Sequence, residues 1–115
     1  MYGLNDKIVS AGIENCFISE ITVAELKFGA ANSERMKQNK ETVDNFISLF
    51  SVLCILDSLD IYASEKARLR KTGKPVDDFD LLIGSIAIAN DLILVTNNKE
   101  HFNRLNNIKI VNWIE

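Results

Sequence analysis

The sequence predicts an α/β fold in which helices cover both faces of a parallel β-sheet. Short apolar runs of strand length alternate with longer segments of helical periodicity, as expected where crossover helices join parallel strands. The run Leu92–Val95 is continuously apolar, which is typical of a strand buried on both faces. The 115 residues make one domain, 1–115, able to bury about two-thirds of its unfolded surface.

The N-terminal half is expected to hold three helices and two strands. Thr22 and Glu25 have the spacing of a capping box at the start of one helix, and Ser33 can cap the amphipathic helix after it. The expected elements are a helix over 5–12, a strand over 16–19, helices over 21–31 and 33–50, and a strand over 52–56.

The C-terminal half continues the alternation. Gly73 is expected to close a helix, because glycine accepts the left-handed conformation common just past a helix end. The expected elements are helices over 57–72 and 77–89, a strand over 92–95, a short helix over 99–105 and a last strand over 108–111.

Acidic residues mark the candidate site. Asp77, Asp78 and Asp80 open a helix that is then apolar almost all the way round, and Glu25 shares the apolar stripe of its own helix. Two carboxylates about 4 Å apart repel by ~4 kcal/mol at an effective dielectric of 20, and a divalent cation between them reverses that sign. Mg²⁺ or Mn²⁺ suits a site built from oxygen ligands alone.

The polar segment Thr96–Asn98 follows the third strand directly. In parallel sheets the sites lie at the carboxyl ends of the strands, so Thr96 and Asn98 are expected beside the acids. Structural interpretations stay open for all these residues. Glu25 can be the last member of the capping box, Asp77 and Asp78 can be helix caps, and Asn98 can be a turn residue.

Five basic residues precede the acidic turn. They can form a solvated helix face or an edge that binds phosphate or a protein partner. They are Lys66, Arg68, Arg70, Lys71 and Lys74. The net charge of −3 excludes general attraction to polyanions, so contact with nucleic acid needs a local patch of this kind.

Cys16 and Cys54 lie in apolar runs without the spacing of metal ligands, so we expect two buried cysteines that stay reduced. No apolar run has the length of a membrane span. Together these observations indicate a cytoplasmic protein.

The order of these motifs resembles that of a PIN domain, specifically a VapC-type toxin ribonuclease. The resemblance rests on Ile18–Gly29 with Glu25, on Gly73–Val76 followed by Asp80–Ile83, and on Leu94–Asn98 with Phe102 downstream. It implies a three-layer α/β/α sandwich and an endoribonuclease that depends on Mg²⁺ or Mn²⁺.

The resemblance also implies roles for particular residues. The catalytic set would be Glu25, Asp80 and Asn98. Beside the resemblance, the residues themselves suggest a metal set of Asp80, Glu25 and Asp78, with Asp78 binding a second metal or orienting water. They also suggest contacts to substrate or antitoxin from Arg68, Arg70, Lys71 and Thr96. The implied partners are RNA (tRNA in many members), a cognate VapB-like antitoxin and a second copy in a homodimer, with no membrane.

The sequence departs from this pattern at its start. PIN domains begin with an apolar strand that ends in Asp, and no such segment precedes Asp6. We therefore expect a truncated PIN domain whose sheet lacks its usual central strand, leaving two neighbouring strands with unpaired edges, and whose site lacks one carboxylate. Catalysis is expected to be weak or absent.

Two other classes are compatible with the sequence. The first is a catalytically inactive PIN remnant that binds an antitoxin or dimerises. The second is a receiver-like signalling domain, which needs a phospho-accepting Asp after a central strand, whereas the acids of this chain lie at helix starts.

Overall fold

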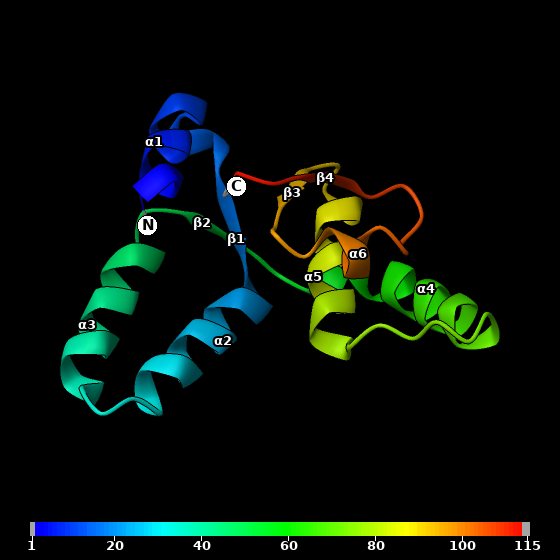
Figure 1. Cartoon of the computed structure of the whole chain (residues 1–115), viewed down its shortest axis with the longest axis horizontal. Coiled ribbons are helices and arrows are strands. Elements are labelled where there is room, and N and C mark those ends of the chain that lie inside the picture. The colour runs from blue at the N-terminus through cyan, green and yellow to red at the C-terminus, as the bar shows by residue number, and fades with distance from the viewer. Residues whose placement is uncertain (1, 114–115) are drawn as a thin grey trace.

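A computed structural model describes residues 2–113, with side chains from residue 6 onward. Helices and short strands alternate along the chain (Figure 1). The helices are α1 (Tyr2–Ala11), α2 (Glu20–Ala31), α3 (Met36–Ile47), α4 (Leu59–Lys71), α5 (Asp78–Ala89) and α6 (Lys99–Phe102), with 3-10 turns η1 (Ile13–Asn15) and η2 (Leu56–Ser58). The strands are β1 (Phe17–Ser19), β2 (Ser51–Leu53), β3 (Ile93–Val95) and β4 (Lys109–Val111). This order confirms the α/β prediction.

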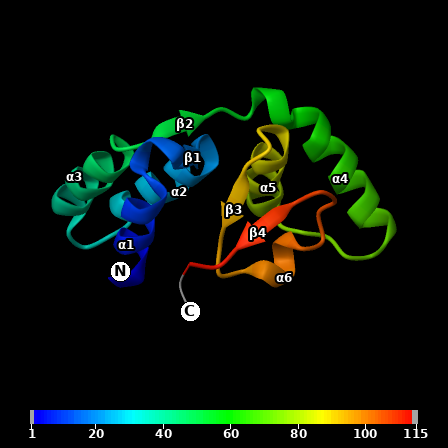
Figure 2. The same cartoon turned by 90° about the horizontal axis from the view of Figure 1, so that it is seen from above.

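The strands form two separate parallel pairs. β1 pairs with β2, and β3 pairs with β4. No hydrogen-bonded ladder joins the two pairs within residues 2–113, in agreement with the expected unpaired edges. Figures 1 and 2 show β1 and β3 as the inner strands, with β2 and β4 outside them.

The core lies in the C-terminal half. Leu69 of α4, Leu81 of α5 and Leu105 after α6 pack together, and Leu81 is 1% exposed. Gly84 lets the segment after α6 approach α5, because a Cβ at this position would stand 2.6 Å from the Leu105 Cδ2 atom. The Ser85 hydroxyl donates to the Leu81 carbonyl at 2.7 Å, so this buried polar group is satisfied within α5.

Two predicted helix starts were wrong. Ser19, not Thr22, caps α2: its hydroxyl oxygen accepts the Thr22 backbone N–H at 3.0 Å, and the helix begins at Glu20. Ser33 caps nothing, because its hydroxyl donates to the Ala30 carbonyl at 2.7 Å, and α3 begins only at Met36. The strand over 52–56 is shorter than predicted, since the chain enters η2 after Leu53.

The predicted burial of the third strand on both faces was also wrong. Ile93 is 62% exposed and Val95 is 38% exposed. β3 has a partner on one side only, so its apolar side chains are covered by few neighbours. Cys54 is likewise exposed, whereas Cys16 is half-buried, and both thiols are free. None of the helices in residues 2–113 combines the length and apolar character needed to cross a membrane.

Glu65 is a buried carboxylate at the centre of a polar network. Arg68 donates to both of its oxygens, at 2.9 and 3.0 Å, and the Asn106 backbone N–H donates to one of them. The hydrogen bond from Arg68, opposed in part by burial and aided by Asn106, holds the pKa of Glu65 below its usual range. Arg68 also donates to the Arg104 carbonyl, so this network ties α4 to the segment after α6.

We expect Glu65→Gln to lower the free energy of unfolding by about 1–2 kcal/mol at pH 7, because it weakens hydrogen bonds to a charged acceptor. A depressed folded-state pKa stabilises above the unfolded pKa and loses this effect as pH falls through the folded value. The stability difference between wild type and variant should therefore shrink below about pH 4.5, the ordinary pKa of a glutamate. Urea unfolding between pH 3 and 7 measures it. Glu34→Gln, at an exposed position, is the control, and a constant difference across this range would contradict the role of Glu65.

Candidate active site

The candidate site lies where the N-terminal and C-terminal halves meet. Glu25 lies in the second turn of α2, and Asp80 lies in the first turn of α5. Because Ser19 caps α2, Glu25 is not the capping-box residue that its spacing allowed. Partial desolvation, followed by the negative charges of Asp80 and Asp77, raises the pKa of Glu25. The cause of this shift is the contact between α2 and α5, which places Glu25 near Asp80 and Asp77.

Asp80 also meets the segment that follows β3. The His101 Nδ1 atom lies 3.4 Å from the Asp80 Oδ2 atom and 3.0 Å from the Asn98 Nδ2 atom. An unprotonated Nδ1 can accept from Asn98, and a protonated Nδ1 can donate to Asp80, so the tautomer of His101 decides which contact forms. The Asn98 Nδ2 atom is occupied by His101, which leaves the amide oxygen of Asn98 available as a ligand.

His101 was missed at the sequence level, where it had no role in the site. Its spacing from Asn98 could have indicated one, because residues three apart at the start of a helix share a side. Thr96 fixes the position of Asn98, since its hydroxyl oxygen accepts the Asn98 backbone N–H at 3.0 Å. Thr96 therefore shapes the turn that carries Asn98, and its contact with substrate or antitoxin stays a prediction.

Asp77 and Asp78 differ in their surroundings. Asp77 caps α5, with its Oδ2 atom accepting the Phe79 backbone N–H at 3.1 Å. Asp78 pairs with Lys66 at 2.8 Å and accepts from the Tyr62 hydroxyl at 3.0 Å. The hydrogen bonds from Lys66 and then Tyr62 hold the pKa of Asp78 below its usual range. The role of Asp78 as a metal ligand stays a prediction, and a cation there would compete with Lys66.

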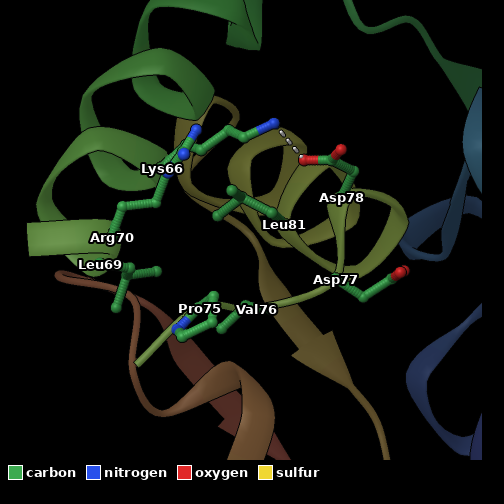
Figure 3. Close-up of a pocket in the computed structure, with 8 residues that line it drawn as sticks. All are labelled: Lys66, Leu69, Arg70, Pro75, Val76, Asp77, Asp78 and Leu81. Atoms are coloured by element: carbon green, nitrogen blue, oxygen red, sulfur yellow. Dashed lines mark ion pairs between the residues drawn. The ribbon is translucent and has the colours of Figure 1, made fainter. Parts of the chain in front are cut away.

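A pocket of about 340 Å³ lies beside this ion pair, between α4 and the start of α5. Figure 3 shows the Lys66 side chain reaching across to Asp78, while Asp77 points away from Lys66. Leu69 and Leu81 line the pocket together with Arg70. Arg70 and Lys71 are exposed, as a contact with substrate or a protein partner requires. Arg68 instead holds Glu65, so its predicted contact role, which stays untested, would have to coexist with this structural one.

The donor set fits a hard divalent cation. Glu25 and Asp80 supply carboxylate oxygens that repel one another, and Asn98 supplies a neutral oxygen. Mg²⁺ commonly binds one or two carboxylates and keeps several waters. Within residues 6–113, however, no group of three or more His, Cys, Asp or Glu side chains is close enough to hold a metal by itself. The site can therefore supply part of a coordination sphere.

Asp80→Asn is expected to lower the pKa of Glu25, because it removes the larger of the two negative charges that raise it. Carboxyl ¹³C shifts of Glu25 followed from pH 3 to 7 measure the change. Asp78→Asn is the matched control, because Asp78 is not among the groups that shift Glu25. An unchanged Glu25 titration in Asp80→Asn would show that the two carboxylates are not neighbours.

Comparison with known proteins found consistent similarity. The family model described as PIN domain matches residues 4–108. The chain is 36% identical over 97 residues to Ribonuclease VapC2 of Rickettsia felis, covering 84% of this chain and 72% of that protein. It is also 36% identical over 97 residues to the tRNA(fMet)-specific endonuclease VapC of Salmonella typhimurium, covering 84% of this chain and 74% of that protein.

Solved structures of VapBC complexes contain chains with the same fold. The chain superposes on a chain of the DNA-bound VapBC from Salmonella typhimurium with a TM-score of 0.93 and 30% identity, covering 99% of this chain and 86% of that one. VapBC2 from Rickettsia felis, bound to a DNA fragment from its promoter, gives a TM-score of 0.90 and 31% identity, with coverage of 97% and 86%. The arrangement of the two halves is therefore that of a longer solved chain.

Proposed function

Because this chain belongs to the PIN domain family, we propose that it is a metal-dependent endoribonuclease and the toxin of a VapBC-type toxin–antitoxin pair. The observation that carries the proposal is the contact between α2 and α5, which places the carboxylates of Glu25 and Asp80 near one another. Relatives named as ribonucleases and as tRNA(fMet)-specific endonucleases support RNA, and tRNA in particular, as the substrate.

In the proposed mechanism, Glu25 and Asp80 would hold Mg²⁺ or Mn²⁺, and the ion would supply Lewis-acid stabilisation of the charge on the scissile phosphate. The Asn98 amide oxygen adds a neutral ligand, and Thr96 holds Asn98 in place. His101 lies within reach of Asp80 and Asn98, and its Nδ1 atom would orient Asp80 when protonated and Asn98 when unprotonated. In-line attack by water would leave a 5′-phosphate on the product.

The partners belong to the same proposal. A VapB-like antitoxin is supported by the VapBC assemblies on which the chain superposes. Arg70 and Lys71 of the exposed basic face would contact either the RNA backbone or an acidic part of the antitoxin. A homodimer is part of the proposal as well, and the two free cysteines favour action in the reducing cytoplasm.

A second candidate function is an inactive PIN remnant that binds an antitoxin or dimerises. The observations that favour it are the divided sheet and the lack, within residues 6–113, of a third acidic or imidazole ligand close enough to complete a metal site. Such a module would keep the surfaces that contact an antitoxin or a second copy, and it would not cleave RNA.

One assay separates the two candidates. We expect the purified chain to cleave total RNA slowly with Mn²⁺, because one carboxylate of the family's site is missing, and to stop when EDTA removes the metal. A version extended by an N-terminal strand ending in Asp is assayed in parallel. Cleavage by the unextended chain supports the ribonuclease. Cleavage by the extended version alone favours the inactive remnant. Absence of RNA cleavage by both versions contradicts the nuclease proposal.

A further inference from the structure

The single imidazole of the chain lies inside the candidate site. The sequence contains one histidine, His101, and its side chain is 47% exposed. The His101 Nδ1 atom lies 3.4 Å from the Asp80 Oδ2 atom and 3.0 Å from the Asn98 Nδ2 atom. Asp80 belongs to α5, whereas Asn98 directly precedes α6 and His101 lies within it. Because the Asp80 side chain is also 27% exposed, a solvated ion can reach this cluster.

Contacts outside the cluster hold two of its members in place. Phe102, the residue after His101, is 4% exposed. A Cβ at Gly84 of α5 would stand 3.4 Å from the Phe102 Cδ1 atom, so α6 packs closely on α5. The Thr96 hydroxyl oxygen accepts the Asn98 backbone N–H at 3.0 Å. The side chains of Asn98 and His101 therefore start from fixed backbone positions, which reduces the cost of ordering them around a ligand.

The separations between these atoms suit donors to one cation. Two ligand atoms that each lie about 2.1 Å from an ion are about 3.0 Å apart at an octahedral angle and about 3.4 Å apart at a tetrahedral one. A half-turn of the Asn98 amide would put its oxygen in the place of Nδ2, at the same distance from His101. Within residues 6–113, no three His, Cys, Asp or Glu side chains lie close enough to form a site, so this amide oxygen is the third donor beside Asp80 and His101.

We propose that His101 is a metal ligand, and that its Nδ1 atom, together with Asp80 and Asn98, binds Zn²⁺ in preference to Mg²⁺. Imidazole nitrogen is a common ligand of Zn²⁺, whereas Mg²⁺ takes oxygen ligands and keeps several waters. Carboxylate and amide oxygens serve both ions, so His101 is the residue that determines which of them binds more tightly. The inference rests on the proposed function, because Asp80 and Asn98 belong to the proposed metal site.

Nitrogen NMR of the imidazole tests the contact directly. The probe is Zn²⁺ alone, added at pH 8 to the full chain labelled with ¹⁵N at histidine. Because the chain has one histidine, its two ring nitrogens give the only labelled signals. We expect Zn²⁺ to shift the Nδ1 resonance saturably, to the range of a metal-bound nitrogen, and Mg²⁺ in large excess to leave it unchanged. Coordination through Nε2, or no coordination at either nitrogen, would overturn the proposal.

His101→Asn separates a metal ligand from a residue that only positions its neighbours. Asparagine carries a hydrogen-bonding atom at the δ position, as histidine does, so it can keep the contact with Asn98. In calorimetric titrations we expect His101→Asn to weaken Zn²⁺ binding by at least about tenfold and Mg²⁺ binding by less than about twofold. Asp80→Asn should weaken the binding of both ions. An equal loss for the two ions in His101→Asn would show a positioning role alone and would overturn the proposal.

Two controls exclude binding elsewhere on the chain. Cys54 has an exposed free thiol, a group that binds Zn²⁺, so Cys54→Ser should keep the wild-type affinity for this ion. Asn98→Ala should weaken Zn²⁺ binding. Unchanged affinity in both Asn98→Ala and Asp80→Asn would mean that His101 binds an adventitious ion only, and would contradict the proposal.

These measurements contain no RNA, so the two proposals can fail separately. Zn²⁺ bound through Nδ1 in a chain that cleaves no RNA with Mn²⁺ would support the role of His101 and contradict the nuclease proposal. Cleavage with Mn²⁺ in a chain whose imidazole does not bind Zn²⁺ would contradict the role of His101 alone.

Discussion

Asp80→Asn is expected to lower the rate of Mn²⁺-dependent RNA cleavage by at least about 100-fold. This exceeds the usual effect of residues that only orient metal ligands, about 10- to 100-fold, because Asp80 is proposed as a ligand itself. Asparagine keeps the size of the side chain, which is 27% exposed, and removes one negative charge. The change therefore acts on the attraction for the cation and not on packing. Initial rates on a defined tRNA measure the effect.

Asp91→Asn is the matched control for this experiment. Asp91 is 85% exposed at its side chain and pairs with Lys109 at 2.8 Å, on β4 and outside the site. Its variant should cleave at the wild-type rate. Thermal unfolding of both variants should match the wild type within a few degrees. If Asp80→Asn and Asp91→Asn are equally active, Asp80 does not hold the metal.

Leu81→Ala is expected to lower the free energy of unfolding by about 3 kcal/mol. Leu81 is 1% exposed and lies against Leu69 and Leu105, so truncation leaves a cavity between α4, α5 and the segment after α6. Domains of this size are commonly stable by only about 5–15 kcal/mol. The loss should be visible as a lower midpoint in urea unfolding followed by circular dichroism.

Leu56→Ala is the control, because it removes the same atoms from an exposed leucine. Leu56 is 71% exposed, so the same truncation should change stability by about 0.5 kcal/mol or less. Similar effects of the two substitutions would mean that Leu81 is not a core residue.

Much of the fold could be predicted because local patterns and tertiary structure agree. Gly73 ends the predicted helix with a positive φ of 73°, and the Lys74 N–H donates to the Leu69 carbonyl at 3.0 Å. The exposure of β3 could not be predicted from the sequence. A continuous apolar run shows that a strand is able to be buried, but it does not show whether other elements cover it. Whether neighbours cover it depends on sheet partners, which the run Leu92–Val95 does not encode.

The site was predictable in part for the same reason. Acids on apolar stripes indicated Glu25 and Asp80, and the contact between α2 and α5 places them near one another. The stripe of Glu25 is not buried as predicted, since Glu25 is exposed and Phe28 is 68% exposed. The pairing of Asp78 with Lys66 depends on two helices that the fold brings together, and residue type alone does not reveal it. Glu65 and Arg68 lie three residues apart on α4, so their ion pair could have been predicted from this spacing. His101 escaped notice because its neighbour Asp80 lies 21 residues away.

The unequal distribution of buried residues between the two halves has a consequence for assembly of the site. In the N-terminal half, Ile18, Ser19 and Ala30 are buried, whereas the other buried residues, including Leu69, Leu81, Phe102 and Leu105, lie from Ser58 onward. Units with few buried contacts open at low free energy, without global unfolding. On this ground we expect the N-terminal unit, which carries Glu25, to open before the C-terminal one. The apparent affinity for a cation would then be the intrinsic affinity multiplied by the fraction of molecules in which that unit is closed.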